Sequence, residues 1–121
     1  MSYIHKRKEA FRCAFRGVWM LFRDEAHAKI HAAATVLVIA AGFLFHIARW
    51  EWCAVLICIG TVIMAEAVNT AIERVCDKVC TERNPLIGQA KDIAAGAVLV
   101  LAIISVVIAA IIFIPKIAAM L

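Results

Sequence analysis

The stretch Ala65-Glu-Ala-Val-Asn-Thr-Ala-Ile-Glu-Arg-Val-Cys-Asp77 decides how this chain folds. It follows a run from Trp52 to Ala65 that carries no charged residue. On a helix that turns about 100° per residue, its polar residues fall on one face. These residues, at spacings of three, four and four, are Glu66, Asn69, Glu73 and Asp77. The sequence therefore predicts a helix that starts within a membrane and ends in a line of polar groups, and charge at membrane depth usually marks a functional site.

The rest of the chain supplies enough apolar sequence for three membrane spans. Of its 121 residues, 65% are hydrophobic, which exceeds the usual share in a soluble domain. Runs with at most one charge cover residues 32–48, 52–72 and 93–115, and about 20 apolar residues cross the hydrocarbon core. The first run reaches this length when the flanking Lys29 and His31 extend to the boundary. We predict a single domain over residues 1–121, with transmembrane helices at about 29–48, 52–79 and 89–115.

Residues 4–24 predict a helix of another kind. Their apolar residues recur at helical spacing, and most of their basic residues occupy the remaining face. Such an amphipathic helix lies along a membrane surface. It serves either as a simple anchor or, in addition, as a basic contact for a bound phosphate. The expected fold is therefore all-α, with an N-terminal amphipathic surface helix followed by three transmembrane helices.

Basic residues set the expected orientation. Six of them precede the first span and four lie between the second and third spans, whereas the other two ends carry only Arg49 and Lys116. The positive-inside rule places the N-terminus and the 74–91 connection in the cytoplasm. Trp50, Trp52 and Phe113 then fit an aromatic belt at the outer boundary. The net charge of +4 is interpreted as contact with anionic headgroups, and no nucleic-acid partner is expected.

Cysteine and histidine pairs give weaker signals. Cys76 and Cys80 are one helical turn apart, and so are His27 and His31. This spacing would suit two of the ligands of a metal ion, but the sequence shows no second pair that would complete such a site. We interpret the cysteines as small packing residues and the histidines as interfacial polar residues. The five cysteines predict no disulfide framework, because they lie within a span or on the reducing side.

The polar face suits a reaction between a water-soluble anion and a membrane alcohol. At about 1.5 Å per residue, Glu66 lies about 10 Å deeper than Glu73, where a carboxylate is able to accept a proton from a lipid hydroxyl. Glu25 and Glu73 have the oxygen chemistry to share Mg²⁺, and Lys91 is able to neutralise phosphate charge. A proton-coupled transporter that uses Glu66 as its proton site is the alternative from another class. The residues alone leave both alternatives open.

Two motifs resemble a known family. The first is Glu66-Ala-Val-Asn-Thr-Ala-Ile-Glu73-x-x-x-Asp77, and the second is Ala90-Lys91-Asp92-x-x-Ala-x-Ala-Val98. Together with Glu25 and the three spans, they are similar to the signature of the bacterial diacylglycerol kinase family, which are small integral-membrane lipid kinases unrelated to soluble kinases. The resemblance covers nearly the whole chain. It implies a homotrimer with active sites between neighbouring subunits at the membrane interface, and transfer of the γ-phosphate of Mg-ATP to a lipid alcohol.

The resemblance also implies roles for particular residues. Glu66 would be the catalytic base and would meet the lipid substrate together with Ala95. Glu25 and Glu73 would hold the Mg²⁺ that is bound to ATP. The nucleotide and its phosphates would be bound by Lys6, Glu25, Asn69, Glu73, Asp77, Glu82, Lys91 and Asp92.

Other positions distinguish branches of the family. The enteric diacylglycerol kinase type has a tyrosine where this chain has Cys13, and an acid where it has His31. The chain is more similar to the Gram-positive-type branch, whose members resemble undecaprenol kinases. This similarity implies undecaprenol as the acceptor, with diacylglycerol, which would give phosphatidic acid, as the alternative. The implied location is the bacterial plasma membrane, with the N-terminus and the active site on the cytoplasmic side.

Overall fold

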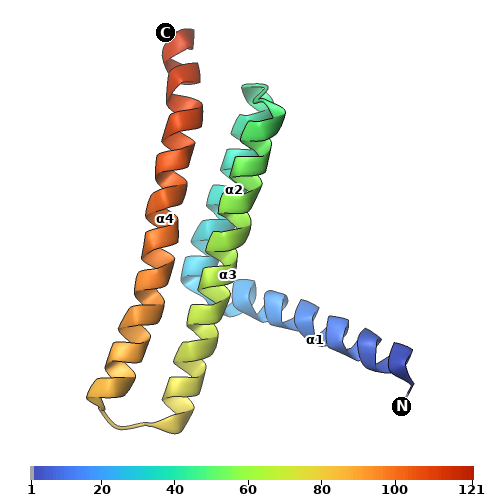
Figure 1. Cartoon of the computed structure of the whole chain (residues 1–121), viewed down its shortest axis with the longest axis vertical. Helices are drawn as coiled ribbons and strands as arrows, with labels where there is room; N and C mark the ends of the chain where they lie inside the picture. The colour runs from blue at the N-terminus through green and yellow to red at the C-terminus, as the bar shows by residue number, and fades with distance from the viewer. Residues whose placement is uncertain (1) are drawn as a thin grey trace.

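The computed structural model describes residues 2–121, which form four α-helices and no strand (Figure 1). The helices are α1 (Tyr3–Asp24), α2 (Ala26–Leu44), α3 (Arg49–Val79) and α4 (Pro85–Met120). By length and composition, α2, α3 and α4 are each able to cross a membrane. The predicted all-α membrane fold, with an amphipathic helix before three spans, is confirmed. The homotrimer stays a prediction.

The helices α3 and α4 begin earlier than the sequence predicts, because side chains cap their first turns. With 31 and 36 residues they are about 46 and 54 Å long, whereas the hydrocarbon core is about 30 Å thick. The Glu51 carboxylate accepts a hydrogen bond from the backbone N–H of Ala48 (2.9 Å). The Asn84 side chain accepts from two backbone N–H groups of α4, and Pro85 occupies the first helical position. Both helices therefore extend beyond the membrane core.

A tight turn joins α2 to α3 and ends α2 at Leu44 instead of residue 48. The backbone N–H of Ile47 donates to the carbonyl of Gly42 (3.1 Å), and His46 adopts the left-handed conformation with φ of 50°. Together with a neighbouring bond from the His46 N–H, this is a Schellman motif, which satisfies the last carbonyls of a helix. Gly42 also permits close packing, because a Cβ there would lie 2.6 Å from the Trp52 ring. We call residues 45–48 the hairpin end of the bundle, and residues 80–84 the loop end.

The helix α3 is the centre of the bundle. It packs against both α2 and α4, whereas within residues 2–121 no Cα atom of α2 lies within 8 Å of one in α4. A core cluster lies at the hairpin end and comprises Ile47, Val55, Ile112 and Phe113. Phe113 is 9% exposed and lies beside the Phe45 ring, with 6.1 Å between ring centroids. Phe113 is therefore a core residue, and its assignment to the aromatic belt is wrong.

An ion pair links α3 to α4 at the hairpin end. Lys116 Nζ lies 3.2 Å from Glu51 Oε2, while the other oxygen of Glu51 caps α3. Glu51 is only 6% exposed, and an unpaired carboxylate at such a position would be strongly destabilising. The pair therefore holds the two helices together at the end of the bundle that is remote from the polar face of α3.

The helix α1 leaves the bundle at a steep angle partway along α3, so that the loop end of α3 and α4 extends beyond it (Figure 1). Leu21, near the end of α1, is buried against the bundle. In contrast, the apolar side chains of Phe11, Phe15 and Trp19 are 64–73% exposed. An exposed apolar stripe on a helix outside the bundle is typical of a helix that lies on a membrane surface. With α1 on the surface, the loop end projects into water.

Candidate active site

Glu66 is held inside the protein by a contact from α2. The residue is only 6% exposed, and its Oε1 lies 3.1 Å from Nε2 of His31. The His31 side chain is itself only 24% exposed. Because an ionised carboxylate can only accept hydrogen bonds, the imidazole N–H is the donor when Glu66 is charged. The structure thus brings together two polar side chains that are 35 positions apart in the sequence.

The second oxygen of Glu66, Oε2, has no hydrogen bond within residues 2–121, because the one bond to this carboxylate reaches Oε1. In the same part of the chain, only Asn69 Oδ1 is both fully enclosed and without a partner. Glu66 Oε2 therefore keeps some solvent-accessible surface, although the side chain is only 8% exposed. The carboxylate has one oxygen held by His31 and one without a partner in this part of the chain.

An apolar groove runs from His31 toward the hairpin end. Its volume is about 320 Å³, and residues of α2, α3 and α4 line it, including His31, Thr35, Val62 and Ser105. The groove lies where the backbones of α2 and α4 stay apart, since no Cα atom of α2 lies within 8 Å of one in α4. An apolar groove at membrane depth fits a hydrocarbon chain. His31, which bonds to Glu66, lines the end of the groove nearer the loop end.

Asn69 and Glu73 form a second polar pair, closer to the loop end. The Asn69 Nδ2 donates a hydrogen bond to Glu73 Oε1 (3.1 Å), and the enclosed Asn69 Oδ1 has no partner within residues 2–121. Buried polar atoms are nearly always hydrogen-bonded, and an exception at a site is commonly completed by an ion, a water or a ligand. This amide oxygen therefore marks a position where a bound polar group is expected.

Arg74 ties the junction of α1 and α2 to α3. Its Nη2 lies 3.2 Å from Asp24 Oδ2 and 3.9 Å from Glu25 Oε1. Hydrogen bonds from Arg23 and, secondarily, from Arg74 hold the pKa of the Asp24 carboxyl below its usual value. The Asp24 carboxylate therefore stays charged and keeps its pairing near neutral pH. The contacts place Glu25 beside the turn of α3 that carries Glu73.

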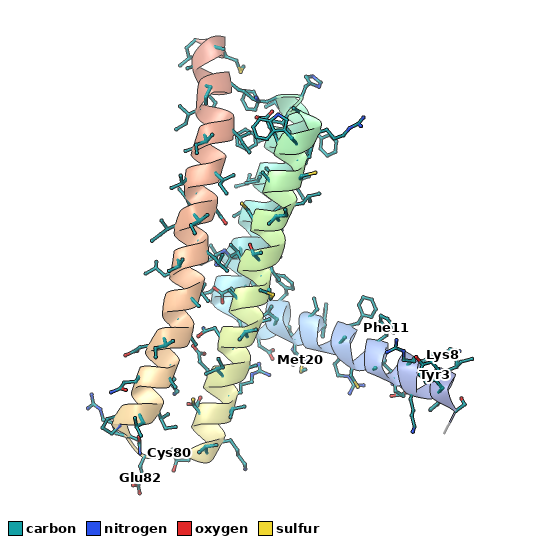
Figure 2. The ribbon with its side chains drawn as sticks, in the orientation of Figure 1. Tyr3, Lys8, Phe11, Met20, Cys80 and Glu82 are labelled. Atoms are coloured by element: carbon teal, nitrogen blue, oxygen red, sulfur yellow. The ribbon has the colours of Figure 1, made fainter. Side chains whose placement is uncertain are left out.

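The loop between α3 and α4 forms a polar pocket of about 540 Å³. Figure 2 shows Cys80 and Glu82 at this end of the bundle. Across the loop, Lys91 Nζ donates to Asp77 Oδ1, so that the last turn of α3 and the first turns of α4 are joined by an ion pair. The pocket contains three of the predicted nucleotide-binding residues, which are Asp77, Glu82 and Lys91.

Three predicted site residues lie outside these clusters. Lys6 is exposed on α1 between Tyr3 and Lys8, which Figure 2 shows at the far tip of α1, away from the loop end. Asp92 and Ala95 are exposed on α4. A single chain therefore gathers most of the predicted site along α3 and the loop, but it does not bring Lys6 to that site.

The histidine and cysteine pairs differ in what they contact. His27 is exposed, whereas His31 contacts Glu66, and the sequence interpretation of both as interfacial polar residues missed this contact. The signal available in the sequence was a histidine near the start of one span and an acid near the end of the next. Cys76 is buried, and Cys80 Sγ donates to the backbone carbonyl of Glu82 (3.1 Å).

The donor chemistry of the site fits Mg²⁺. Within residues 2–121, no three His, Cys, Asp or Glu side chains form a group that could hold a metal unaided. Mg²⁺ does not need such a group, because it is commonly bound by one or two carboxylates together with substrate phosphates and water. The Glu25 and Glu73 carboxylates would be its hard oxygen ligands, and Asn69 Oδ1, which has no partner within residues 2–121, is a further oxygen on the residue that bonds to Glu73.

Taken together, these features define a membrane protein whose polar site begins at a buried carboxylate and ends in a water-exposed pocket. The family model for prokaryotic diacylglycerol kinase matches residues 12–113. The chain is 42% identical over 108 residues to the undecaprenol kinase of Bacillus subtilis (strain 168), a match that covers 89% of this chain and 88% of that protein. The chain belongs to the prokaryotic diacylglycerol kinase family, and the resemblance seen in its motifs is confirmed.

Two further relatives carry the name diacylglycerol kinase. The protein from Synechocystis sp. is 35% identical over 107 residues, which are 88% of this chain and 61% of that protein. The protein from Pseudomonas aeruginosa is 33% identical over 81 residues, which are 67% of this chain and 66% of that protein. All three relatives are lipid kinases by name, although their names give two different lipids.

Proposed function

We propose that the chain is a lipid kinase that transfers the γ-phosphate of ATP to undecaprenol. The observation that carries the proposal is the position of Glu66, a buried carboxylate that keeps one oxygen without a partner within residues 2–121 and is bonded to His31, a residue lining an apolar groove. Such a group is suited to a substrate with a hydroxyl head and a hydrocarbon tail. Undecaprenol is favoured over diacylglycerol because the 42% identical relative named undecaprenol kinase is matched over 88% of its length.

In this proposal Glu66 is the general base. The lipid hydroxyl oxygen bonds to the γ-phosphorus while the bond from that phosphorus to the β–γ bridging oxygen breaks, and ADP leaves with the bridging oxygen. The hydroxyl proton passes to Glu66 Oε2. The transfer is direct, without a phospho-enzyme. Because Glu66 lies about 10 Å from Glu73 along α3, the base meets the lipid at the membrane boundary while the nucleotide stays in water.

The nucleotide and its phosphates bind toward the loop end, at Asn69, Glu73, Asp77, Glu82 and Lys91. Lys91 neutralises phosphate charge, and its contact with Asp77 holds the ammonium group at the pocket before the nucleotide arrives. Mg²⁺ held by Glu25 and Glu73 would neutralise charge on the phosphates of ATP. Arg74 keeps Glu25 within reach of that role by pairing with it and with Asp24.

Neighbouring subunits of a homotrimer complete the site. Lys6, Asp92 and Ala95 lie on exposed surfaces of one chain, so their roles in nucleotide and lipid binding require a partner surface. The membrane helices also leave many large apolar side chains exposed along their length. Lipid and subunit contacts would cover these faces. The abundance of basic residues at the N-terminus and near the loop end favours a cytoplasmic location for both, where ATP is available.

Two alternatives predict different chemistry. A diacylglycerol kinase would keep the same site and use another alcohol, as the names of the relatives that are 35% and 33% identical suggest. A proton-coupled transporter would use Glu66 alone and would have no need for the polar pocket at the loop end. The transporter alternative fails if ATP is consumed only when a lipid alcohol is present.

Lipid-dependent ATP consumption separates these alternatives. Purified protein in detergent, supplied with Mg²⁺ and ATP, is expected to form ADP only after undecaprenol is added, as measured by an enzyme-coupled ADP assay. A saturated alkane of similar length is the control, because it fills the groove without a hydroxyl group. ADP formation that is equal with the alkane, or absent with every alcohol tested, would contradict the proposed function.

A further inference from the structure

Glu66 has one hydrogen-bond partner among residues 2–121, and that partner is the His31 imidazole. The two residues come from different helices, so the contact depends on how α2 and α3 are packed. His31 also lines the loop-end part of the apolar groove, and its side chain is 24% exposed. The imidazole therefore lies at the position where the hydroxyl of a bound lipid would approach the carboxylate.

Without a hydrogen-bond partner, the carboxylate of a glutamate has no single fixed orientation. The terminal torsion of a glutamate side chain is broad and roughly two-fold, so the carboxylate plane is not set by the side chain itself. A hydrogen bond from His31 Nε2 to Oε1 sets that plane and leaves Oε2 without a partner within residues 2–121.

We propose that His31 is the positioning residue for Glu66, holding its carboxylate in the orientation in which Oε2 meets the hydroxyl of the lipid acceptor. This inference rests on the proposed function, in which Glu66 is the base. His31 acts through Glu66 and takes no part in binding the nucleotide, whose pocket lies at the loop end. Loss of the donor should therefore lower kcat and leave the KM for Mg-ATP unchanged.

Three substitutions separate positioning from packing. His31→Gln keeps an N–H donor at about the place of Nε2, whereas His31→Phe keeps a ring of similar volume and removes the donor. His27→Phe is the matched control, because His27 is an exposed histidine one helical turn away on α2. Each variant is purified in detergent, checked for the same size-exclusion profile and the same Mg-ATP binding, and assayed for kcat and KM with undecaprenol.

We expect His31→Phe to lower kcat by about ten- to a hundredfold, the range that corresponds to one hydrogen bond to a charged group. His31→Gln should recover most of that loss, and His27→Phe should match the wild type. Equal losses in His31→Phe and His31→Gln would show a packing role and overturn the inference. Full kcat in His31→Phe together with an inactive Glu66→Gln would overturn it too, while leaving the proposed function in place. A fully active Glu66→Gln would instead contradict the assignment of Glu66 as the general base, and with it the proposed function.

Discussion

Glu66→Gln is expected to abolish lipid phosphorylation while the protein still folds and still binds Mg-ATP. Glutamine keeps the size of the side chain and an oxygen that accepts from His31, but it cannot take a proton. General base catalysis contributes about 10²–10⁴-fold to a rate, so kcat should fall by at least two orders of magnitude. The residues proposed to bind the nucleotide, from Asn69 to Lys91, make no hydrogen bond to Glu66 within residues 2–121, so the binding of Mg-ATP should be unaffected. The measurement is kcat with undecaprenol, beside the Kd for Mg-ATP by calorimetry.

A matched control guards against a general effect of removing charge. Glu9→Gln neutralises a carboxylate on α1 whose one ion pair within residues 2–121 is the surface pair with Arg12 (3.6 Å), and such pairs contribute little to stability. This variant should retain wild-type kcat. Equal turnover in Glu66→Gln and Glu9→Gln would contradict the assignment of Glu66 as the base.

Glu73→Gln is expected to weaken the binding of Mg-ATP. The substitution removes one of the two carboxylates proposed for the metal and changes the group that accepts from Asn69. A lost interaction with a charged group corresponds to about a tenfold or greater rise in the KM for Mg-ATP. The KM for undecaprenol should stay unchanged, because the groove is lined by other residues. Steady-state kinetics at several Mg²⁺ concentrations measure both values.

The dependence on Mg²⁺ provides the internal check for Glu73. A weakened metal site should be partly restored by raising free Mg²⁺ at constant ATP. An unchanged KM and an unchanged response to Mg²⁺ would remove Glu73 from the metal site. A lower kcat without any change in KM would give Glu73 a part in the chemistry that the proposed mechanism does not include.

The three membrane helices could be predicted because each apolar run is about long enough to cross the membrane core, where a helix satisfies its own backbone hydrogen bonds. The ends of the helices could not be predicted as well, because they depend on local bonds. The start of α3 depends on Glu51, and the end of α2 depends on a left-handed His46 in a position that glycine usually occupies. Phe113 was misassigned because the sequence does not reveal which side of a span faces another helix.

The polar face of α3 could be predicted for a different reason, since its residues lie on one continuous helix and their spacing defines their neighbours. The contact of His31 with Glu66 depends on the rotation of α2 about its own axis, which a single sequence does not specify. Lys6 illustrates a further limit. The tip of α1 lies away from the loop end within one chain, so its proposed contact with the nucleotide depends on subunit assembly (Figure 2).

The most direct test of the central claim is phosphate transfer from γ-labelled ATP by the purified protein, with undecaprenol and diacylglycerol offered separately and in competition. The account predicts labelled undecaprenyl phosphate as the preferred product, with Mg²⁺ required and no label left on the protein. Preferential labelling of diacylglycerol would contradict the proposed acceptor, although the role of Glu66 would stand. Labelled protein without labelled lipid, or no transfer to either alcohol from well-folded protein, would contradict direct transfer to a membrane alcohol.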